Sequence, residues 1–110
     1  MSAVAERIAR RSATVTAVDL DELPPERHRV YFALHSDSGQ IKIGCSFDPD
    51  LRLVELERYT NAHLVLLTTV VGGFDLERAL HVRFAALRHE GEWFAPGPDL
   101  TSYIAAAASP

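Results

Sequence analysis

The stretch Val30–Cys45, VYFALHSDSGQIKIGC, decides the fold that this chain is expected to adopt. Apolar and other side chains alternate in 30–34 and again in 40–45, as in two strands that each turn one apolar row to the same core. The turn-rich residues between them predict that the two strands form an antiparallel hairpin. Burying both apolar rows together fixes the parity of the register, because a slip of one residue turns a row to the wrong face. A pairing of Leu34 with Ile41 satisfies this condition.

The residues after the hairpin predict helices arranged around one more strand. Asp48 and Pro49 have the residue types preferred at the N-cap and first position of a helix. The run 64–71 is apolar on both alternating faces, as in a strand covered on two sides, and 75–88 has an apolar stripe at helical spacing. In chain order we expect strands or extended pieces at 30–34, 40–45, 64–71 and 91–94, and helices at 49–59, 75–88 and 100–107, the last capped by Asp99. The fold class is therefore α+β, a small three-stranded, mainly antiparallel sheet flanked by helices in the order β-β-α-β-α-α.

Length and composition point to one globular domain. The chain has 110 residues, of which 47% are hydrophobic and 24% charged. Its one cysteine, Cys45, excludes an intramolecular disulfide framework and favours a reducing compartment. No apolar run is long enough to span a bilayer or form a signal peptide, so we expect a cytoplasmic protein with no membrane partner. Residues 1–29, broken by Pro24-Pro25, are interpreted as an N-terminal arm or linker before a domain at 30–110.

The charge balance argues against strong general affinity for nucleic acid. The formal net charge is −4, from 11 basic and 15 acidic residues, whereas phosphate binding depends on clustered Lys and Arg. Ten of the basic residues are arginines, and Lys42 is the single lysine. A lysine kept in such a sequence is either chance or a position where a compact ammonium is required.

Tyr31 and Lys42 fall on the same face of the expected hairpin as diagonal neighbours, and Gly44 leaves space beside the phenol. A phenol acts as a base at neutral pH if its pKa falls by ~3 units from about 10, which requires about 4 kcal/mol. An ammonium ~4 Å away supplies about that much at an effective dielectric near 20, and a metal ion would supply more. The alternative is a half-exposed tyrosine and a solvated lysine on the sheet surface.

The helix expected at 75–88 places Glu77, His81 and Arg88 on a narrow arc at the rim of its apolar stripe. One carboxylate does not hold Mg²⁺ alone, but Mg²⁺ is often bound by one or two carboxylates together with substrate phosphates and water. The alternative is an ordinary Glu–His pair at the surface, four residues apart on the helix.

Arg52 stands in the first turn after the Asp48-Pro49 helix start. Its guanidinium could clamp a phosphate through two parallel hydrogen bonds, or it could form a local ion pair with Glu55. Trp93 is more simply interpreted as a ring that closes the core than as one that stacks on a base.

Five short motifs occur in order, and together they resemble one family. They are Val30-Tyr31-Phe32, Lys42-Ile43-Gly44, Asp48-Pro49-x-x-Arg52-Leu53, Glu77-x-x-x-His81 and Gly91-Glu92-Trp93-Phe94. This set resembles the GIY-YIG nuclease superfamily, in particular the compact phage and bacterial branch of GIY-YIG-like DNA-binding domains in which KIG replaces YIG. The resemblance covers about residues 29–95.

The resemblance implies a metal-dependent endonuclease that hydrolyses phosphodiester bonds of DNA. Tyr31 matches the tyrosine proposed as the base for the attacking water, and Glu77 matches the single carboxylate that holds one divalent ion, Mg²⁺ or Mn²⁺. Arg52 matches the arginine that steadies charge on the phosphate. We expect the catalytic residues to be Tyr31, Lys42, Arg52 and His81, with Lys42 stabilising the phenolate, and the contacts with nucleic acid to come from Arg52 and Arg88.

Departures from the family pattern favour a second hypothesis. Val30-Tyr31-Phe32 lacks the Gly and the Ile of the GIY motif, and Lys42 replaces the second tyrosine. The asparagine that many members carry after the glutamate is also absent, since Asn61 is the chain's one asparagine. The alternative function is a catalytically weak or inactive nucleic-acid-binding or interaction module on the same fold. Under either hypothesis DNA is contacted through a local patch, and a fused or partner domain would add affinity.

Overall fold

The computed structural model describes residues 28–109. The expected arm at 1–29 therefore lies almost entirely outside the described residues. The elements are β1 (Arg29–His35), β2 (Ile41–Ser46), α2 (Pro49–Thr60), β3 (Leu64–Val71), α3 (Phe74–Arg83), the 3₁₀ turn η3 (Ala85–Leu87), β4 (Arg88–Glu90), β5 (Trp93–Phe94) and α4 (Pro98–Ala108). Within the described range, no helix is both long and apolar enough to cross a membrane.

The β1–β2 hairpin has the register that the two apolar rows predict. Leu34 pairs with Ile41, and Tyr31 pairs with Gly44. The turn is closed by a hydrogen bond from the His35 amide to the Gln40 carbonyl at 2.9 Å. This register sends the two strands' apolar rows to one side of the sheet and Tyr31 to the other.

The sheet has five strands, in the order β3-β1-β2-β5-β4, and the expectation of three strands is wrong. The difference arises where a single helix was expected at 75–88. Helix α3 ends at Arg83, the chain makes a 3₁₀ turn, and β4 then pairs with β5 around Gly91, whose φ of 57° places it in the left-handed region. Such a turn suits glycine, which has no Cβ to clash there. The short hairpin extends the sheet beyond β2.

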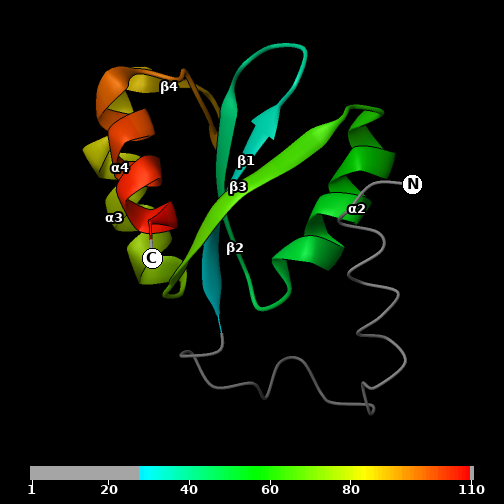
Figure 1. Ribbon diagram of the computed structural model, residues 1–110, viewed down its shortest axis with the longest axis horizontal. Coiled ribbons are helices and arrows are strands. Elements are labelled where there is room, and N and C mark those ends of the chain that lie inside the picture. The colour runs from blue at the N-terminus through cyan, green and yellow to red at the C-terminus, as the bar shows by residue number, and fades with distance from the viewer. Residues whose placement is uncertain (1–27, 110) are drawn as a thin grey trace.

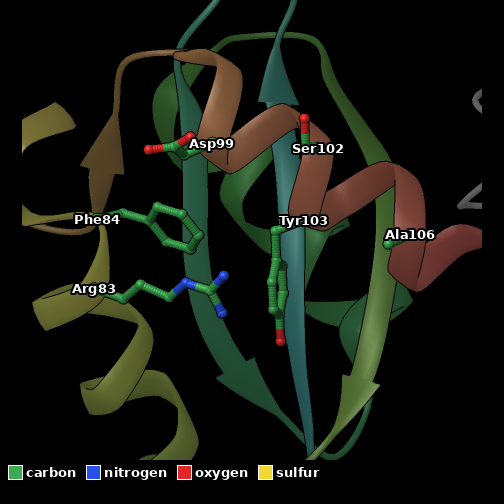
Figure 2. A pocket seen from close by; sticks show the side chains of 6 residues that line it. All are labelled: Arg83, Phe84, Asp99, Ser102, Tyr103 and Ala106. Atoms are coloured by element: carbon green, nitrogen blue, oxygen red, sulfur yellow. The ribbon is translucent and has the colours of Figure 1, made fainter.

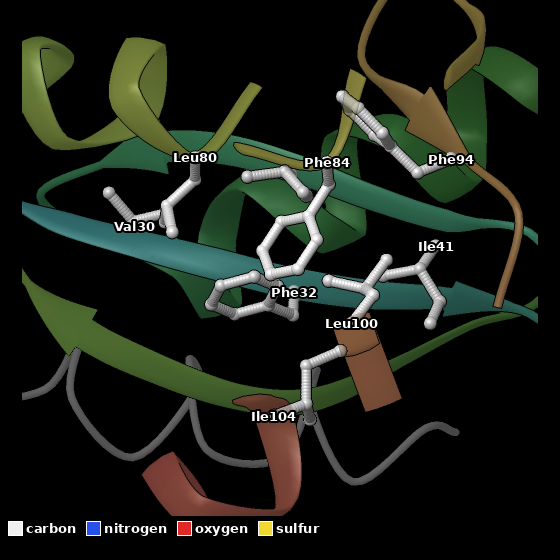
Figure 3. Packing of buried hydrophobic residues seen from close by; sticks show 9 residues of the cluster. Val30, Phe32, Ile41, Leu80, Phe84, Phe94, Leu100 and Ile104 are labelled. Atoms are coloured by element: carbon white, nitrogen blue, oxygen red, sulfur yellow. The ribbon is translucent and has the colours of Figure 1, made fainter. Parts of the chain in front are cut away.

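Helices cover both faces of this sheet (Figure 1). Helix α2 packs on one face, over a cluster that includes Tyr31, Leu53 and Leu64, whereas α3 and α4 cover the other. The larger cluster on the α3/α4 face interleaves side chains from strands and both helices (Figure 3). Its buried members are Val30, Phe32, Ile41, Ile43, Leu80, Phe84, Phe94, Leu100 and Ile104. The sheet is thus the middle layer of three.

Two expected helix starts had different outcomes. Asp48 is the N-cap of α2, and its carboxylate accepts a hydrogen bond from the Leu51 amide at 3.2 Å, as predicted. Asp99 does not cap α4, because the helix begins at Pro98, two residues earlier than expected, with Gly97 as N-cap. Asp99 lies instead in the first turn, where the helix dipole still favours a carboxylate.

The strand expected at 64–71 is confirmed as β3, an edge strand that both α2 and α4 contact.

Candidate active site

The Tyr31 side chain lies over Gly44, its partner across the hairpin. Its ring is almost completely buried, with 1% of the residue exposed. A Cβ on residue 44 would overlap the ring and hydroxyl of Tyr31, so glycine leaves the space that the phenol occupies. The alternative of a half-exposed surface tyrosine is therefore wrong, and the hydroxyl is held in one place at the β2 side of the hairpin.

Arg52 is the cation that acts on this phenol. It lies in the first turn of α2, which Asp48 and Pro49 start beside the end of β2. Its charge and side-chain hydrogen bonding both lower the pKa of Tyr31. The guanidinium also forms the expected pair with Glu55, at 3.2 Å, and about half of each side chain is exposed. Such an exposed pair contributes little to stability, so the guanidinium can exchange Glu55 for another anion at low cost.

Burial nevertheless dominates the ionisation of Tyr31. Desolvation, with the negative charges of Glu92 and Glu77, raises the pKa to about 12 despite the opposing effect of Arg52. Burial disfavours a phenolate because the low-dielectric surroundings cannot solvate its charge. In the chain as it stands the phenol is protonated at neutral pH, and a further positive charge is needed before it can act as a base.

The edge of β2 next to this phenol is occupied by side chains and loop, not by a full strand. Strand β5 pairs with β2 only at Ile41 and Lys42. At the next position, the Ile43 amide donates to the main-chain carbonyl of Glu92 at 3.0 Å, and the Ile43 carbonyl lies 2.9 Å from Nε2 of His81. Because a carbonyl can only accept, His81 donates through Nε2. One residue of β2 thus ties Glu92 and helix α3 to the same edge.

Glu77 and Glu92 meet at this edge. Glu77, one turn before His81 on α3, is 8% exposed, and its carboxylate lies 3.7 Å from Nε2 of His81. Burial, a side-chain hydrogen bond with Glu92 and the charge of Glu92 together raise the pKa of Glu77 to about 7. The pKa of Glu92 moves the other way: burial opposes its ionisation, but the hydrogen bond and charge of Lys42 outweigh that effect and lower it. Below about pH 7 the pair therefore holds a proton, on Glu77, that an ordinary pair of carboxyl groups would have lost near neutral pH.

Lys42 is on the expected face, but its ammonium is directed to Glu92. The Nζ–Oε2 distance is 3.0 Å, the Lys42 side chain is 12% exposed, and Nζ lies 5.7 Å from the centre of the Trp93 ring. Trp93 is itself half-buried against the α2-side cluster, as expected for a ring that closes the core. The structure therefore gives Lys42 a carboxylate partner and gives the phenol of Tyr31 a different cation, Arg52.

The site joins the two faces of the sheet at the part of β2 that β5 does not pair with. Helix α3 lies on the face opposite α2, yet the carboxylate of Glu77 acts on both Tyr31 and Cys45 of the hairpin. For Cys45, burial first and then the charges of Glu77 and Glu92 raise the pKa of the thiol. Five predicted residues gather here: Tyr31, Lys42, Arg52, Glu77 and His81.

The sixth predicted residue does not join them. Arg88 lies on β4, the outer strand of the sheet, because α3 ends five residues before it and the helical arc that grouped it with Glu77 is not continued. Its Nε donates to the Gly91 carbonyl at 2.6 Å. Glu92 is a site residue that was not predicted: it stands in the Gly91-Glu92-Trp93-Phe94 motif, from which no role for its carboxylate was inferred. The signal available was its position beside Trp93 in an extended piece that had to pair with some strand of the sheet.

The donor set at this edge fits a hard divalent cation that is also held by substrate. Mg²⁺ and Mn²⁺ prefer carboxylate oxygen, and a pair of carboxyl groups that holds a proton offers an anionic position once that proton leaves. Over residues 28–109 there is no group of three or more His, Cys, Asp or Glu side chains that could hold a metal ion. An ion bound here would therefore complete its coordination with water or phosphate oxygens.

A separate hollow of about 550 Å³ lies between α3 and α4, and none of the predicted site residues lines it. Figure 2 shows the guanidinium of Arg83 beside the rings of Phe84 and Tyr103. The guanidinium carbon lies 5.3 Å and 5.1 Å from the two ring centres, within the range of cation–π attraction. These contacts join α3 to α4.

The fold and the site define an α+β domain whose polar groups converge along β2, beyond its short pairing with β5. The chain belongs to the T5orf172 domain family, whose family model matches residues 28–105. That match includes every residue placed at the site above. No curated protein and no solved structure matched the chain.

Proposed function

We propose that this protein is a metal-dependent endonuclease that hydrolyses phosphodiester bonds of DNA. The observation that supports the proposal is that Arg52 of α2 and Glu77 of α3 both act on the ionisation of Tyr31 of β1. Membership of the T5orf172 family, a phage-associated family reported among GIY-YIG-like or HNH-type nucleases, supports a nuclease or a nucleic-acid-binding role. The resemblance of the five motifs to the GIY-YIG superfamily supports the nuclease.

In this proposal Glu77 holds one Mg²⁺ or Mn²⁺ ion, with Glu92 beside it. When bound there, such an ion would supply positive charge for phosphate oxygens and for the ionisation of nearby acids. Such a charge is needed because the site is otherwise rich in carboxylates and the whole chain carries a net charge of −4. His81 fixes the position of Glu77's helix through its hydrogen bond to the Ile43 carbonyl.

Arg52 binds the phosphate. Its guanidinium is half-exposed and releases Glu55 when a phosphate offers two oxygens in its plane. The same guanidinium lies beside the Tyr31 phenol, so it connects the base to the charge that develops on the phosphate.

Tyr31 takes the proton of the attacking water at its phenolic oxygen. It must first lose its own proton, and its pKa of about 12 sets the size of that obstacle. Arg52 favours the loss of the phenol's proton because its positive charge lowers the pKa of Tyr31. A cation held by Glu77 would offset the negative charges of Glu77 and Glu92, which raise that pKa.

A second candidate function is a binding module without catalysis. The observation that favours it is the same raised pKa of Tyr31, together with a lysine where the family pattern has a second tyrosine. Such a module would still bind DNA through Arg52 and a local patch, with further affinity from a fused or partner domain.

Nicking of supercoiled plasmid tests these two functions. The proposal predicts nicking with Mg²⁺ or Mn²⁺, none in a chelator, and loss of nicking in Glu77→Gln, Tyr31→Phe and Arg52→Ala. Matched controls are Glu90→Gln on β4 and Arg58→Ala at the far end of α2, both exposed and outside the site. Nicking that survives Glu77→Gln would contradict the proposed mechanism, in which Glu77 holds the metal ion. DNA binding that depends on Arg52 without any nicking would establish the binding module instead.

A further inference from the structure

Three aromatic rings gather where β1 and α3 begin. The ring of His28 lies 6.2 Å from the ring of Phe47, edge-on at 88°, and 6.2 Å from the ring of Phe74. The Gly72 amide donates to the His28 carbonyl at 3.1 Å, which ties the start of β1 to the loop before α3. We call His28, Phe47 and Phe74 the aromatic cluster. Phe74 is 62% exposed, so the cluster presents a ring to solvent.

The aromatic cluster is continuous with the candidate active site along the chain. Phe74 precedes Glu77 by three residues on α3, which places the two on one side of the helix about 4.5 Å apart along its axis. Phe47 directly precedes Asp48, the N-cap of the helix that carries Arg52. The two segments that supply the metal ligand and the phosphate contact therefore also supply the rings.

The charges near Phe74 favour a neutral occupant. Asp75 and Glu77 lie in the same first turn of α3, and the nearest cation of that turn, Arg78, is paired with Asp75 at 3.8 Å. Asp75 and Glu77 give a phosphate no attraction to the Phe74 ring itself, whereas an uncharged base can stack on that ring. A DNA strand whose phosphate lies at Arg52 and Glu77 brings its own bases into this region.

We propose that the aromatic cluster is a stacking surface for an unpaired base of the DNA strand whose phosphate is bound at the candidate active site. The proposal rests on the proposed function, and it names the substrate class as DNA with a single-stranded or locally unpaired segment. Bases inside a duplex are already stacked on both faces, so a protein ring can take one only where the strand is open or the base is extruded. Stacking on aromatic rings binds such bases with little sequence preference.

Binding is measured by fluorescence anisotropy in Ca²⁺, with a labelled oligonucleotide of about 15 nucleotides, single-stranded and as a duplex of the same sequence. The proposal predicts tighter binding of the single strand, a loss of about ten-fold in Phe74→Ala, and recovery in Phe74→Tyr, which keeps the ring. The matched control is Val82→Ala, an apolar residue of the same helix that is 76% exposed. It should bind as the unchanged protein does. Photocrosslinking with 5-iodouracil should place the adduct on Phe74 or Phe47.

Each other outcome has a definite meaning. Equal binding by Phe74→Ala and Val82→Ala, or an adduct elsewhere, while binding still depends on Arg52, would overturn the stacking surface and leave the proposed function standing. Phe74-dependent DNA binding without any plasmid nicking would support the stacking surface and contradict the proposed endonuclease activity. No DNA binding at all would overturn both. Sedimentation showing a dimer that Phe74→Ala dissociates would assign the cluster to a second copy of the chain and overturn the proposal.

Discussion

The phenol of Tyr31 occupies the space beside Gly44 in which every other amino acid would place its Cβ. The two residues are partners across the β1–β2 hairpin. They are therefore in direct contact, although the hairpin turn lies between them in the sequence. This contact sets where the hydroxyl lies relative to Arg52, and it is open to a direct test by substitution.

Gly44→Ala should displace the Tyr31 ring and destabilise the protein by about 1–3 kcal/mol, the usual cost of overpacking a buried contact. Urea unfolding measures this loss. Gly73→Ala is the control, because a Cβ there meets nothing within 4 Å. Equal stability of the two variants would show that the phenol does not depend on the glycine.

The stability of the metal-free protein should fall as the pH rises from about 5 to 8. Glu77 has a pKa of about 7 in the folded chain, above its ordinary value of 4.5, so between these values the folded state holds a proton that the unfolded state has lost. The stabilisation is complete below the lower value and is lost as the pH passes the higher one, by up to about 3 kcal/mol. Glu77→Gln should remove this dependence, as followed by urea unfolding in chelator at several pH values. Parallel curves for the two proteins would show that Glu77 has no raised pKa.

Lys42→Met should destabilise the protein by about 1–2 kcal/mol, because it leaves Glu92 beside Glu77 without its compensating ammonium. The partial exposure of Glu92 limits the loss. Adding Glu92→Gln should recover part of it, since the uncompensated carboxylate is then gone. A double-mutant cycle at neutral pH gives the coupling, and strictly additive effects would mean that the ion pair is without energetic consequence.

Arg52→Lys separates charge from geometry. Lysine keeps the positive charge, so the dependence of DNA binding on salt should change little, but it lacks the planar fork that meets two phosphate oxygens. We expect nicking to slow by about ten-fold or more, whereas Arg52→Ala should also reduce the salt slope by about one. Full nicking activity in Arg52→Lys would show that catalysis does not need a bidentate contact between Arg52 and the phosphate.

Local patterns were sufficient to predict the hairpin and its neighbours. The two apolar rows of β1 and β2 determine a register, and Asp48-Pro49 starts a helix through side-chain chemistry that needs no distant partner. The same patterns place Tyr31 and Lys42 on one face. These features follow from residues close together in the chain, where periodicity and capping preferences are informative.

Tertiary contacts decided what the sequence did not predict. The helical spacing that grouped Glu77 with Arg88 continues past the point where the chain leaves α3, and β4 and β5 form because β2 has an edge to pair with. Glu92 reaches the site only through this pairing, so its carboxylate could not be assigned beforehand. Lys42 forms an ion pair with Glu92, and Arg52 is the cation that acts on the phenol of Tyr31.

A crystal structure of the protein with Mn²⁺ and a short unpaired oligonucleotide would show whether Glu77, Arg52 and Tyr31 meet at one phosphate. We expect an anomalous Mn²⁺ peak at about 2.2 Å from a Glu77 carboxylate oxygen, with a phosphate between that ion and the Arg52 guanidinium and the Tyr31 hydroxyl facing the phosphorus. Mn²⁺ bound away from Glu77, or a phosphate held without Arg52 and Tyr31, would contradict this arrangement.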